Sequence, residues 1–377
     1  MARSEVHGAG ERVRVRPDLA GRGGYRAGEI VPGSIKLSSN ESGHPPLPGV
    51  LEAVRAASAE ANRYPDNHAT VLRAALAERW AVTSDDVIIG CGSSLLCQEL
   101  VQATCEPGDA VAFGWRSFEA YRLYARTAHA RAITVPNTPD GRLDLPALAA
   151  ACANAEQVGV VFLCSPNNPT GAVITDDELT GFLDAVPRSV PVVVDEAYAE
   201  FATGVTPHAI DWYRAGWRNV VMLRTFSKAY GLAGLRVGYA IGAPELLGAV
   251  HAIRSPFNVS AVAQAAAIAS LQAVDEMDKR VVAVAAGRLW VTERLRRLGL
   301  PVQDSEANFL WLPLGVHADE FAEHCRHEGV VVRSFPPDGA RVTISVQADN
   351  ERLVHVARSW RLSAGDRMSL QSSGAQQ

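Results

Sequence analysis

The middle of the chain alternates short apolar runs with longer stretches of helical periodicity, and this alternation constrains the fold more than any other feature. Runs such as 86–90 (DVIIG) and 158–164 (VGVVFLC) are apolar at almost every position. Strands of this kind are typical of a parallel sheet that is covered on both faces. The sequence therefore predicts an α/β fold with a mostly parallel sheet flanked by helices. The further apolar runs are AVAF, RAITVP, PVVVDEA, NVVMLRT and RVGYAIG.

The pattern changes after about residue 255. A long helical pattern (261–298) leads to the apolar run NFLWLP, and the strand-like runs VVVRSF and ARVTIS follow a predicted helix from His317. The last residues are polar and lack periodicity, so they are predicted to be disordered. The predicted divisions are an N-terminal arm (1–35), a large domain (36–255), a small α+β C-terminal domain (256–364) and a disordered tail (365–377).

Composition and charge narrow the classes of function. Hydrophobic residues make up 47% and charged residues 20% of the chain, as in globular proteins with a large core. The formal net charge of -5, with both signs scattered, argues against a nucleic-acid partner. No stretch approaches the roughly 20 apolar residues of a membrane span, and the first residues lack the apolar core of a signal peptide. We expect a cytoplasmic protein with no membrane partner.

The six cysteines indicate neither a disulfide framework nor a metal site. None of them forms a CxxC pair or has histidines at zinc spacing. His324 and His327 lie three residues apart in a predicted helix, where a solvated face is the better explanation than metal binding. We expect reduced thiols and no metal.

Polar and small residues follow three of the predicted strands. Gly92 and Ser93 lie between a strand and a helix, where free backbone N–H groups can bind a phosphate. Leu95 breaks the dinucleotide pattern GxGxxG, and an ordinary helix start is the alternative. The cluster 164–172 (CSPNNPTGA) and Asp195 follow two further strands. The carboxyl ends of parallel strands are where open α/β sheets bind ligands, so their position favours a binding site.

One lysine has an unusual environment. Lys228 lies in the segment RTFSKAYGLAGLRVG, among small and apolar residues, whereas most lysines are solvated. Such a setting lowers the pKa of the amine and makes it nucleophilic toward a carbonyl group. Thr225, Ser227 and Arg236 supply two hydroxyl groups and a planar cation, which suit a phosphate. A phosphate, a carbonyl group and a ring nitrogen that needs the strand-end aspartate together describe pyridoxal 5′-phosphate.

Nine motifs occur along the chain in the order of one family: SSNES, NRYPDN, GCGSS, WRSFEAY, PNNPTGA, DEAYAEF, TFSKAYGLAGLRVGYAIG, EANFLWLP and RVTIS. From about Tyr25 to Trp360 the chain resembles the fold-type I aminotransferases, which use pyridoxal 5′-phosphate, and within them the histidinol-phosphate/aromatic amino acid branch. CGSSLLCQELVQ and FGWRSFEAY are similar to the actinobacterial phenylalanine/aromatic aminotransferases. The resemblance implies a mostly parallel sheet of seven strands, a smaller C-terminal domain, and an N-terminal arm that reaches the small domain and the substrate site.

The resemblance also implies a role for each residue of the cofactor site. Lys228 binds the cofactor covalently and moves the proton between the substrate Cα and the cofactor, and Asp195 pairs with the ring nitrogen. Tyr198 and Asn168 bind the ring hydroxyl group, and Phe118 stacks on the ring. The phosphate-binding residues are Gly92, Ser93, Thr225, Ser227, Arg236 and, from the neighbouring subunit of a homodimer with shared active sites, Tyr64.

The implied substrates are an aromatic L-amino acid (phenylalanine, tyrosine or tryptophan) and 2-oxoglutarate, which give the aryl 2-oxo acid and L-glutamate. Arg341 binds the substrate α-carboxylate in such enzymes, with Asn40 nearby. Tyr25, Phe257 and Arg333 occupy the remaining substrate positions.

Two departures from the family keep alternatives open. The segment SGHPP (42–46) replaces the usual aromatic residue and glycine of the substrate-side lid, and Phe257 stands where many histidinol-phosphate enzymes carry a tyrosine. Histidinol-phosphate transamination is the first alternative, and a decarboxylase, lyase or aldolase reaction on the same cofactor is the second. A cofactor-binding regulator would need a DNA-binding domain, and the first 35 residues show no helix-turn-helix pattern.

Overall fold

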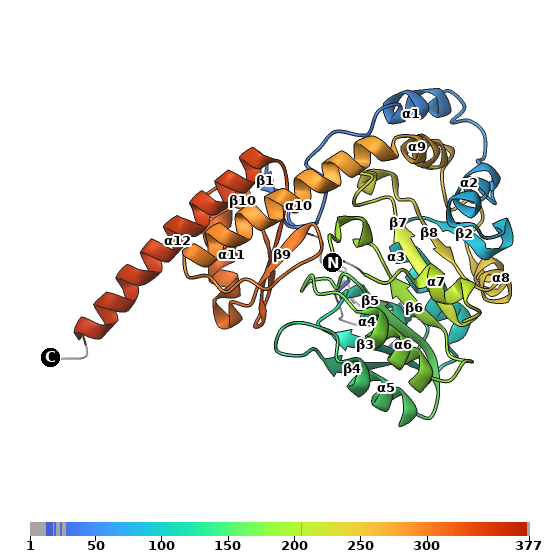
Figure 1. Cartoon of the computed structure of the whole chain (residues 1–377), viewed down its shortest axis with the longest axis horizontal. Coiled ribbons are helices and arrows are strands. Elements are labelled where there is room, and N and C mark those ends of the chain that lie inside the picture. Colours follow the sequence, from blue (N-terminus) through green and yellow to red (C-terminus); the bar gives the residue numbers. More distant parts are fainter. Residues whose placement is uncertain (1–12, 18, 20–22, 25–27, 205, 375–377) are drawn as a thin grey trace, which may run out of the picture.

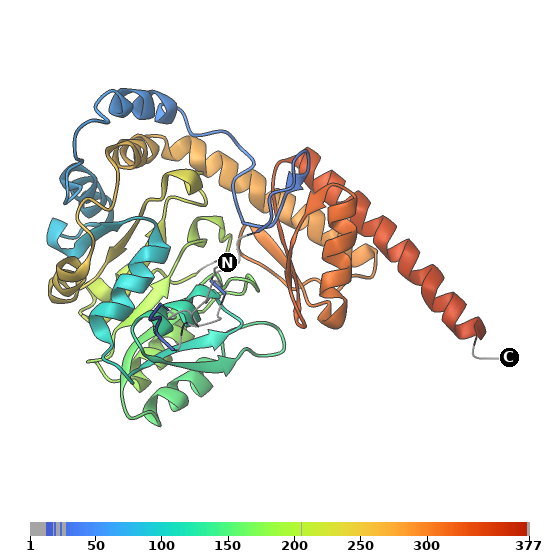
Figure 2. The ribbon, with the colours of Figure 1, turned by 180° about the vertical axis from the view of Figure 1, so that it is seen from behind.

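The computed structural model describes residues 13–17, 19, 23, 24, 28–204 and 206–374. Figure 1 shows a large part around one broad sheet and a smaller part from which a long C-terminal helix extends. Figure 2 shows from behind that helix α10 (Val274–Arg297) runs from the large part to the smaller one. Tyr25, which is predicted at the substrate site, lies outside the described residues.

The large part contains a seven-stranded sheet. Its strands are β2 (Val87–Gly90), β3 (Ala110–Trp115), β4 (Arg131–Pro136), β5 (Val158–Cys164), β6 (Val192–Asp195), β7 (Val220–Thr225) and β8 (Gly238–Ile241). They lie in the order β2-β8-β7-β6-β5-β3-β4. The five strands β7, β6, β5, β3 and β4 are parallel to one another. Strand β8 is antiparallel to both of its neighbours, β2 and β7. The predicted α/β fold with a mostly parallel sheet is confirmed, and each of the seven apolar runs before residue 255 forms one strand of this sheet.

Helices cover both faces of this sheet: α2 (Thr70–Trp80), α3 (Ser93–Thr104), α4 (Ala120–Thr127), α5 (Leu145–Ala153), α6 (Asp176–Ala185), α7 (Ala209–Arg214) and α8 (Pro244–Ile253). Successive residues of a strand point to opposite faces. In β6, Val192 and Val194 therefore pack in one hydrophobic core, with α2, α5, α6 and α7, and Val193 packs in the other, with α3, α4 and α8. Burial on both sides explains why the strands are apolar throughout.

The smaller part contains a second, antiparallel sheet. Its elements, and those that join it to the large part, are β1 (Ile35–Lys36), α1 (Val50–Ser58), α9 (Ala261–Gln272), β9 (Phe309–Leu312), α11 (Ala318–His327), β10 (Val330–Val331), β11 (Arg333–Phe335), β12 (Gly339–Thr343) and α12 (Gln347–Gly374). The sheet has the order β11-β12-β9, and β1 pairs in parallel with β10. The pattern at 261–298 forms two helices, because the backbone of Ala273 leaves the helical region between α9 and α10 (φ -106°, ψ 30°).

The structure at the two ends of the chain can be compared with the predicted N-terminal arm and C-terminal tail. The β1–β10 pairing places Ile35 and Lys36 beside the C-terminal part. Helix α12 runs to Gly374 through most of the segment predicted to be disordered, and its end extends away from the rest of the molecule (Figure 1). Helices without tertiary packing are only marginally stable in water, so the disordered tail stays a prediction. The domain boundaries also stay predictions. In the described residues, no helix is long and apolar enough to cross a membrane. The short 3₁₀ helices are Ser84–Asp86, Ala199–Phe201, Ala233–Leu235 and Gly315–His317.

Candidate active site

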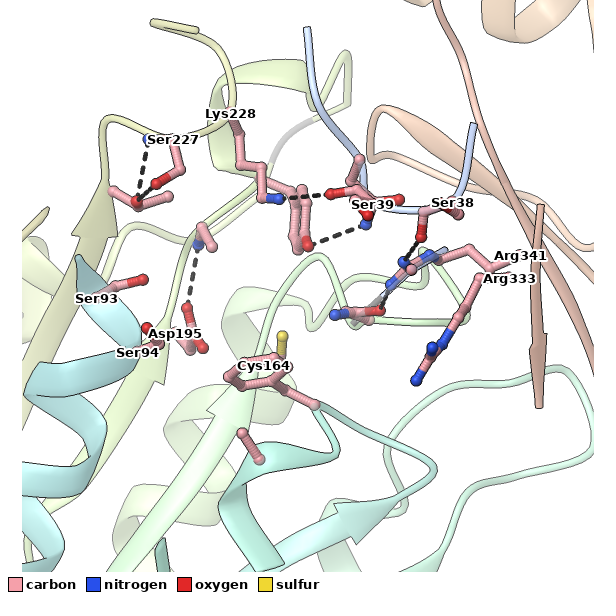
Figure 3. A pocket seen from close by; sticks show the side chains of 18 of the residues that line it. Ser38, Ser39, Ser93, Ser94, Cys164, Asp195, Ser227, Lys228, Arg333 and Arg341 are labelled. Atoms are coloured by element: carbon pink, nitrogen blue, oxygen red, sulfur yellow. Dashed lines mark hydrogen bonds between the residues drawn. The ribbon is translucent and has the colours of Figure 1, made fainter. Parts of the chain in front are cut away.

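A cavity of about 290 Å³ lies where β5, β6 and β7 end, beside the start of α3 and the smaller sheet. It adjoins the carboxyl ends of parallel strands, as expected for a ligand site in such a sheet. Figure 3 shows Lys228, Asp195 and Arg341 around one space. The predicted site residues that line it are Asn40, Ser93, Phe118, Asn168, Asp195, Tyr198, Thr225, Ser227, Lys228, Arg236, Arg333 and Arg341.

Two predicted residues lie away from this cavity. Tyr64 is 83% exposed and Phe257 is 41% exposed, and neither lines it. Their rings stack on each other with centroids 4.6 Å apart. The backbone N–H of Phe257 donates to Asn67 Oδ1 (2.7 Å) and its φ is 56°, so the pair is held in place on the surface. Their predicted roles therefore require a second subunit.

The start of α3 forms one end of the cavity. Gly92 precedes the helix with φ 76°, and no side chain caps the free N–H groups there. The positive φ favours glycine, and a Cβ atom at Gly92 would lie 2.4 Å from Arg236 Nη2, so the guanidinium group would have to move. Arg236 donates to Ser227 Oγ (3.2 Å) and to Ser94 Oγ (3.2 Å). Helix N–H groups, hydroxyls and an arginine suit a phosphate group.

The amine of Lys228 faces the cavity and donates to the carbonyl oxygen of Ser39 (3.0 Å; Figure 3). Burial, reinforced by the positive charge of Arg341, lowers its pKa to about 7. A substantial fraction of the amine is therefore neutral near neutral pH and can act as a nucleophile or a base.

Asp195, at the end of β6, is a buried acid that faces the same cavity. Burial raises its pKa to about 6, and a hydrogen bond from Tyr121 Oη to Oδ2 (2.6 Å) opposes the rise. The backbone N–H of Ala197 donates to Oδ1 (3.3 Å). The pattern of the sequence did not single out Tyr121. Its position three residues after Phe118 in WRSFEAY, one helical turn away, was the available signal.

Arg341 is held by residues from two distant segments, one near the N-terminus and one after β5. Its guanidinium group donates to Asn168 Oδ1 and to the carbonyl oxygen of Ser38 (2.7 Å). Asn40, two residues further on, donates to Tyr198 Oη (3.0 Å) and receives a bond from Thr343 Oγ1 (3.2 Å). The segment that carries Ser38 and Asn40 thereby positions both Arg341 and Tyr198.

A second arginine, Arg333, reaches the cavity beside Arg341 (Figure 3). The two are directly opposite each other on the antiparallel strands β11 and β12. Arg333 Nη2 lies 3.1 Å from Glu119 Oε2, and Glu119 Oε1 lies 3.8 Å from Arg116 Nη1. Glu119, next to Phe118, is a further residue that the sequence did not predict.

The comparisons with known proteins agree with this geometry. Residues 32–358 match the model of the family described as aminotransferase class I and II. The chain belongs to this family. An aromatic amino acid aminotransferase of Nocardia farcinica is 50% identical over 92% of this chain and 97% of its own, and one of Mycobacterium bovis is 47% identical over 93% and 99%. A histidinol-phosphate aminotransferase of Sinorhizobium meliloti, solved in complex with pyridoxal-5′-phosphate, has a TM-score of 0.82 and 29% identity over 88% and 91%.

This aminotransferase therefore has, around one cavity, the uncapped start of a helix beside an arginine, a buried acid and an amine of lowered pKa. The predicted membership of the aminotransferases and the predicted fold are confirmed. The six cysteines are not paired with one another in this structure. The role of each site residue remains a prediction.

Proposed function

We propose that this protein is a pyridoxal 5′-phosphate-dependent aminotransferase that transfers the amino group of an aromatic L-amino acid to 2-oxoglutarate. The observation that carries the proposal is the presence of Lys228, Asp195 and the anion site at α3 in one cavity. The substrate class is supported by the relatives of 46–50% identity, which are named aromatic amino acid aminotransferases.

The residues present fit this cofactor. The conformation of Gly92 keeps the space at α3 open for Arg236 and a phosphate, with Ser94, Ser227 and Thr225 nearby. Asp195 supplies a buried carboxylate for a protonated ring nitrogen, which would offset the cost of burying its charge. Tyr198 and Asn168 supply polar groups between this acid and Arg341.

The cofactor, when bound, supplies an electrophilic carbon and a ring that accepts electrons. In this proposal Lys228 would hold the cofactor at that carbon, and its free amine would move the proton at the substrate Cα. Its pKa of about 7 suits both the removal and the return of a proton at neutral pH. Arg341 binds and orients the α-carboxylate, because Asn168 and Ser38 hold its guanidinium group. Asp195 holds the proton of the ring nitrogen.

Such an enzyme must accept an aromatic side chain and a distal carboxylate in the same place. Arg333 is suited to the distal carboxylate, and its pairing with Glu119 balances its charge when an aromatic ring is bound instead. The same arginine suits a substrate phosphate, so histidinol phosphate is the second candidate. The Sinorhizobium meliloti structure also favours it as a related activity.

A half-reaction screen tests the choice of substrate. The holoenzyme is mixed with single amines, and the visible spectrum follows conversion of the cofactor to its amine form. We expect phenylalanine, tyrosine or tryptophan to react faster than histidinol phosphate at equal concentration. A clear preference for histidinol phosphate would promote the second candidate. If neither the aromatic amino acids nor histidinol phosphate react, the altered SGHPP segment is the first explanation to test, and the proposal of transamination is in question.

We also propose a homodimer in which each subunit completes the site of the other. Supporting it, Tyr64 and Phe257 are exposed and lie outside their own cavity, and further exposed apolar side chains lie on α1, α2 and α8: Leu51, Val71 and Ile253. Large exposed apolar side chains that gather on one region mark an interface.

Mixed dimers test this arrangement. Tyr64→Ala and Lys228→Ala subunits, each inactive alone, should regain activity when combined, because one of the two sites then carries both wild-type side chains. At most about half of the wild-type turnover per dimer is expected, since only one site is restored. Tagged heterodimers that show no recovery would contradict the shared site.

A further inference from the structure

Tyr121 on α4 contacts two residues that have separate places in the cavity. Its hydroxyl group donates to Asp195 Oδ2 (2.6 Å), and its ring lies edge-on to Phe118, with centroids 5.4 Å apart and planes at 90°. Asp195 and Phe118 both line the cavity, whereas Tyr121 does not. One side chain behind the wall therefore supports two residues in it.

The ring of Tyr121 is surrounded by other aromatic rings, and its hydroxyl group lies near Asp195 and the Cys164 thiol. The side chain is completely buried, stacks on Phe162 (4.5 Å, 13°) and is tilted against Phe113 (5.5 Å). A phenylalanine would fill the same space and make the same ring contacts. A buried hydroxyl group costs free energy unless it is hydrogen-bonded, so this one contributes chiefly through Asp195.

The other groups that face Asp195 cannot replace this bond. Cys97 of α3 and Cys164 of β5 are buried neutral thiols, because burial holds their pKa well above the ordinary value. Glu196 is an acid that raises the pKa of Asp195, and Lys228 is a cation that lowers it from across the cavity. In the described part of the chain, the side-chain hydroxyl that donates to the Asp195 carboxylate is that of Tyr121.

We propose that Tyr121 is a positioning residue of the reaction, which orients the Asp195 carboxylate through its hydroxyl group and supports Phe118 through its ring. Asp195 then presents a fixed oxygen to the cofactor ring nitrogen while Phe118 lies against the ring face. The link to the nitrogen depends on the cofactor proposed above, but the effect on Asp195 itself does not.

Tyr121→Phe removes the hydroxyl group and keeps the ring. In the apo-protein, we expect the midpoint of Asp195 protonation, followed by NMR of labelled aspartate carboxyls, to rise by about one pH unit, because a hydrogen bond to a carboxylate favours its charged form. Asp195→Asn identifies the signal. In the holoenzyme we expect kcat to fall roughly tenfold and the cofactor Kd to rise by a similar factor, the equivalent of one pKa unit. The KM for the amine substrate should change little, since Tyr121 does not line the cavity.

Tyr213→Phe is the matched control. The hydroxyl group of Tyr213 donates to Asp86, another buried aspartate, and neither residue lines the cavity. The control should lose similar thermal stability without any change in the Asp195 midpoint or in kcat. If Tyr121→Phe behaves like this control, Tyr121 is only a core residue and the proposal is wrong.

A second variant keeps the tyrosine side chain and should shift the Asp195 midpoint in the opposite direction. Site-specific 3-fluorotyrosine at position 121 makes the hydroxyl group a stronger donor, so the Asp195 midpoint should fall below that of the wild type. This variant also decides the question if Tyr121→Phe does not fold. An unchanged midpoint would overturn the proposal. If instead the midpoint shifts as expected but the cofactor Kd does not, the hydrogen bond stands and the proposed cofactor is the part that fails.

Discussion

The two halves of the cavity are built in different ways. The half with Lys228, Asp195 and α3 comes from the ends of neighbouring strands in one sheet, and several of its residues lie close together in the sequence: Thr225, Ser227 and Arg236 are joined by hydrogen bonds. The half with Arg341 is assembled from segments about 300 residues apart, since the Ser38 and Asn40 contacts to Arg341 and Thr343 each span 303 positions. In the proposed reaction, the sheet edge would fix where the chemistry takes place, and the joining of distant segments would position the arginine for the substrate carboxylate.

The largest effect should come from the strand-end half. Lys228→Ala should lower turnover by at least about a thousand-fold and remove the visible absorbance of the covalently bound cofactor, because no other amine can replace it as nucleophile and base. Arginine should not rescue activity, since a guanidinium group stays protonated. Steady-state kinetics and the absorption spectrum check both points.

Lys36→Ala is the control for this variant. Lys36 pairs with Glu41 (2.9 Å) near the cavity but does not line it. We expect turnover close to the wild type. Near-wild-type activity in Lys228→Ala would show that Lys228 is not the nucleophile and base of the reaction.

An intermediate effect concerns the stability of the apo-protein. The pKa of Asp195 is raised to about 6, so its contribution to stability is fully present below pH 3.8 and is lost as the pH rises through 6. A shift of about two units corresponds to about 3 kcal/mol. Apo Asp195→Asn should therefore be more stable than the apo wild type above pH 6, by up to about this amount, with the difference disappearing near pH 4. Urea unfolding between pH 4 and 8 measures it.

Asp86→Asn should show the opposite sign. Although burial acts to raise the pKa of Asp86, hydrogen bonds from Tyr213 and Thr83 lower it below the ordinary value. Its contribution is present above the unfolded pKa and is lost as the pH falls through the lower folded pKa. The variant should thus be less stable at neutral pH. If the change in stability depended on pH in the same way for both variants, the pKa of Asp195 would not be raised by burial as described.

The smallest effect should come from the substrate half. Glu119→Gln leaves Arg333 without this counter-charge, so binding of 2-oxoglutarate should improve and use of phenylalanine should weaken. The ratio of the two kcat/KM values should change roughly three- to tenfold, since a partly exposed ion pair contributes about 1 kcal/mol.

Asp338→Asn is the comparison for Glu119→Gln. Asp338 pairs with Arg116 rather than Arg333, and it does not line the cavity. We expect its ratio of kcat/KM values to stay near that of the wild type. A change of the same size in both variants would mean that general charge, and not the Arg333 pair, sets the preference.

The strand-end half could be predicted from sequence because its residues lie in local motifs. A lysine among small residues, an aspartate after four apolar residues and a glycine before a helix each have a physical reason that acts over a few positions. Glu119 and Tyr121 could not be found in this way. Their partners, Arg333 and Asp195, are 214 and 74 positions away and meet them only through the tertiary fold. Phe257 matched the family by position, but its placement outside the cavity, stacked on Tyr64, emerges only in three dimensions.

The pairing of β1 with β10 also bears on how the protein is made. A chain leaves the ribosome from its N-terminus, so the seven strands of the large sheet are complete before β10 and β12 exist. The segment with Ser38 and Asn40 must wait through most of synthesis for its partners, and closing so long a loop is slow. The nascent enzyme therefore has its chemical groups in place early and gains a closed substrate pocket last. Shortened chains that end before β12 should contain the large sheet yet lack a binding site for the amino acid.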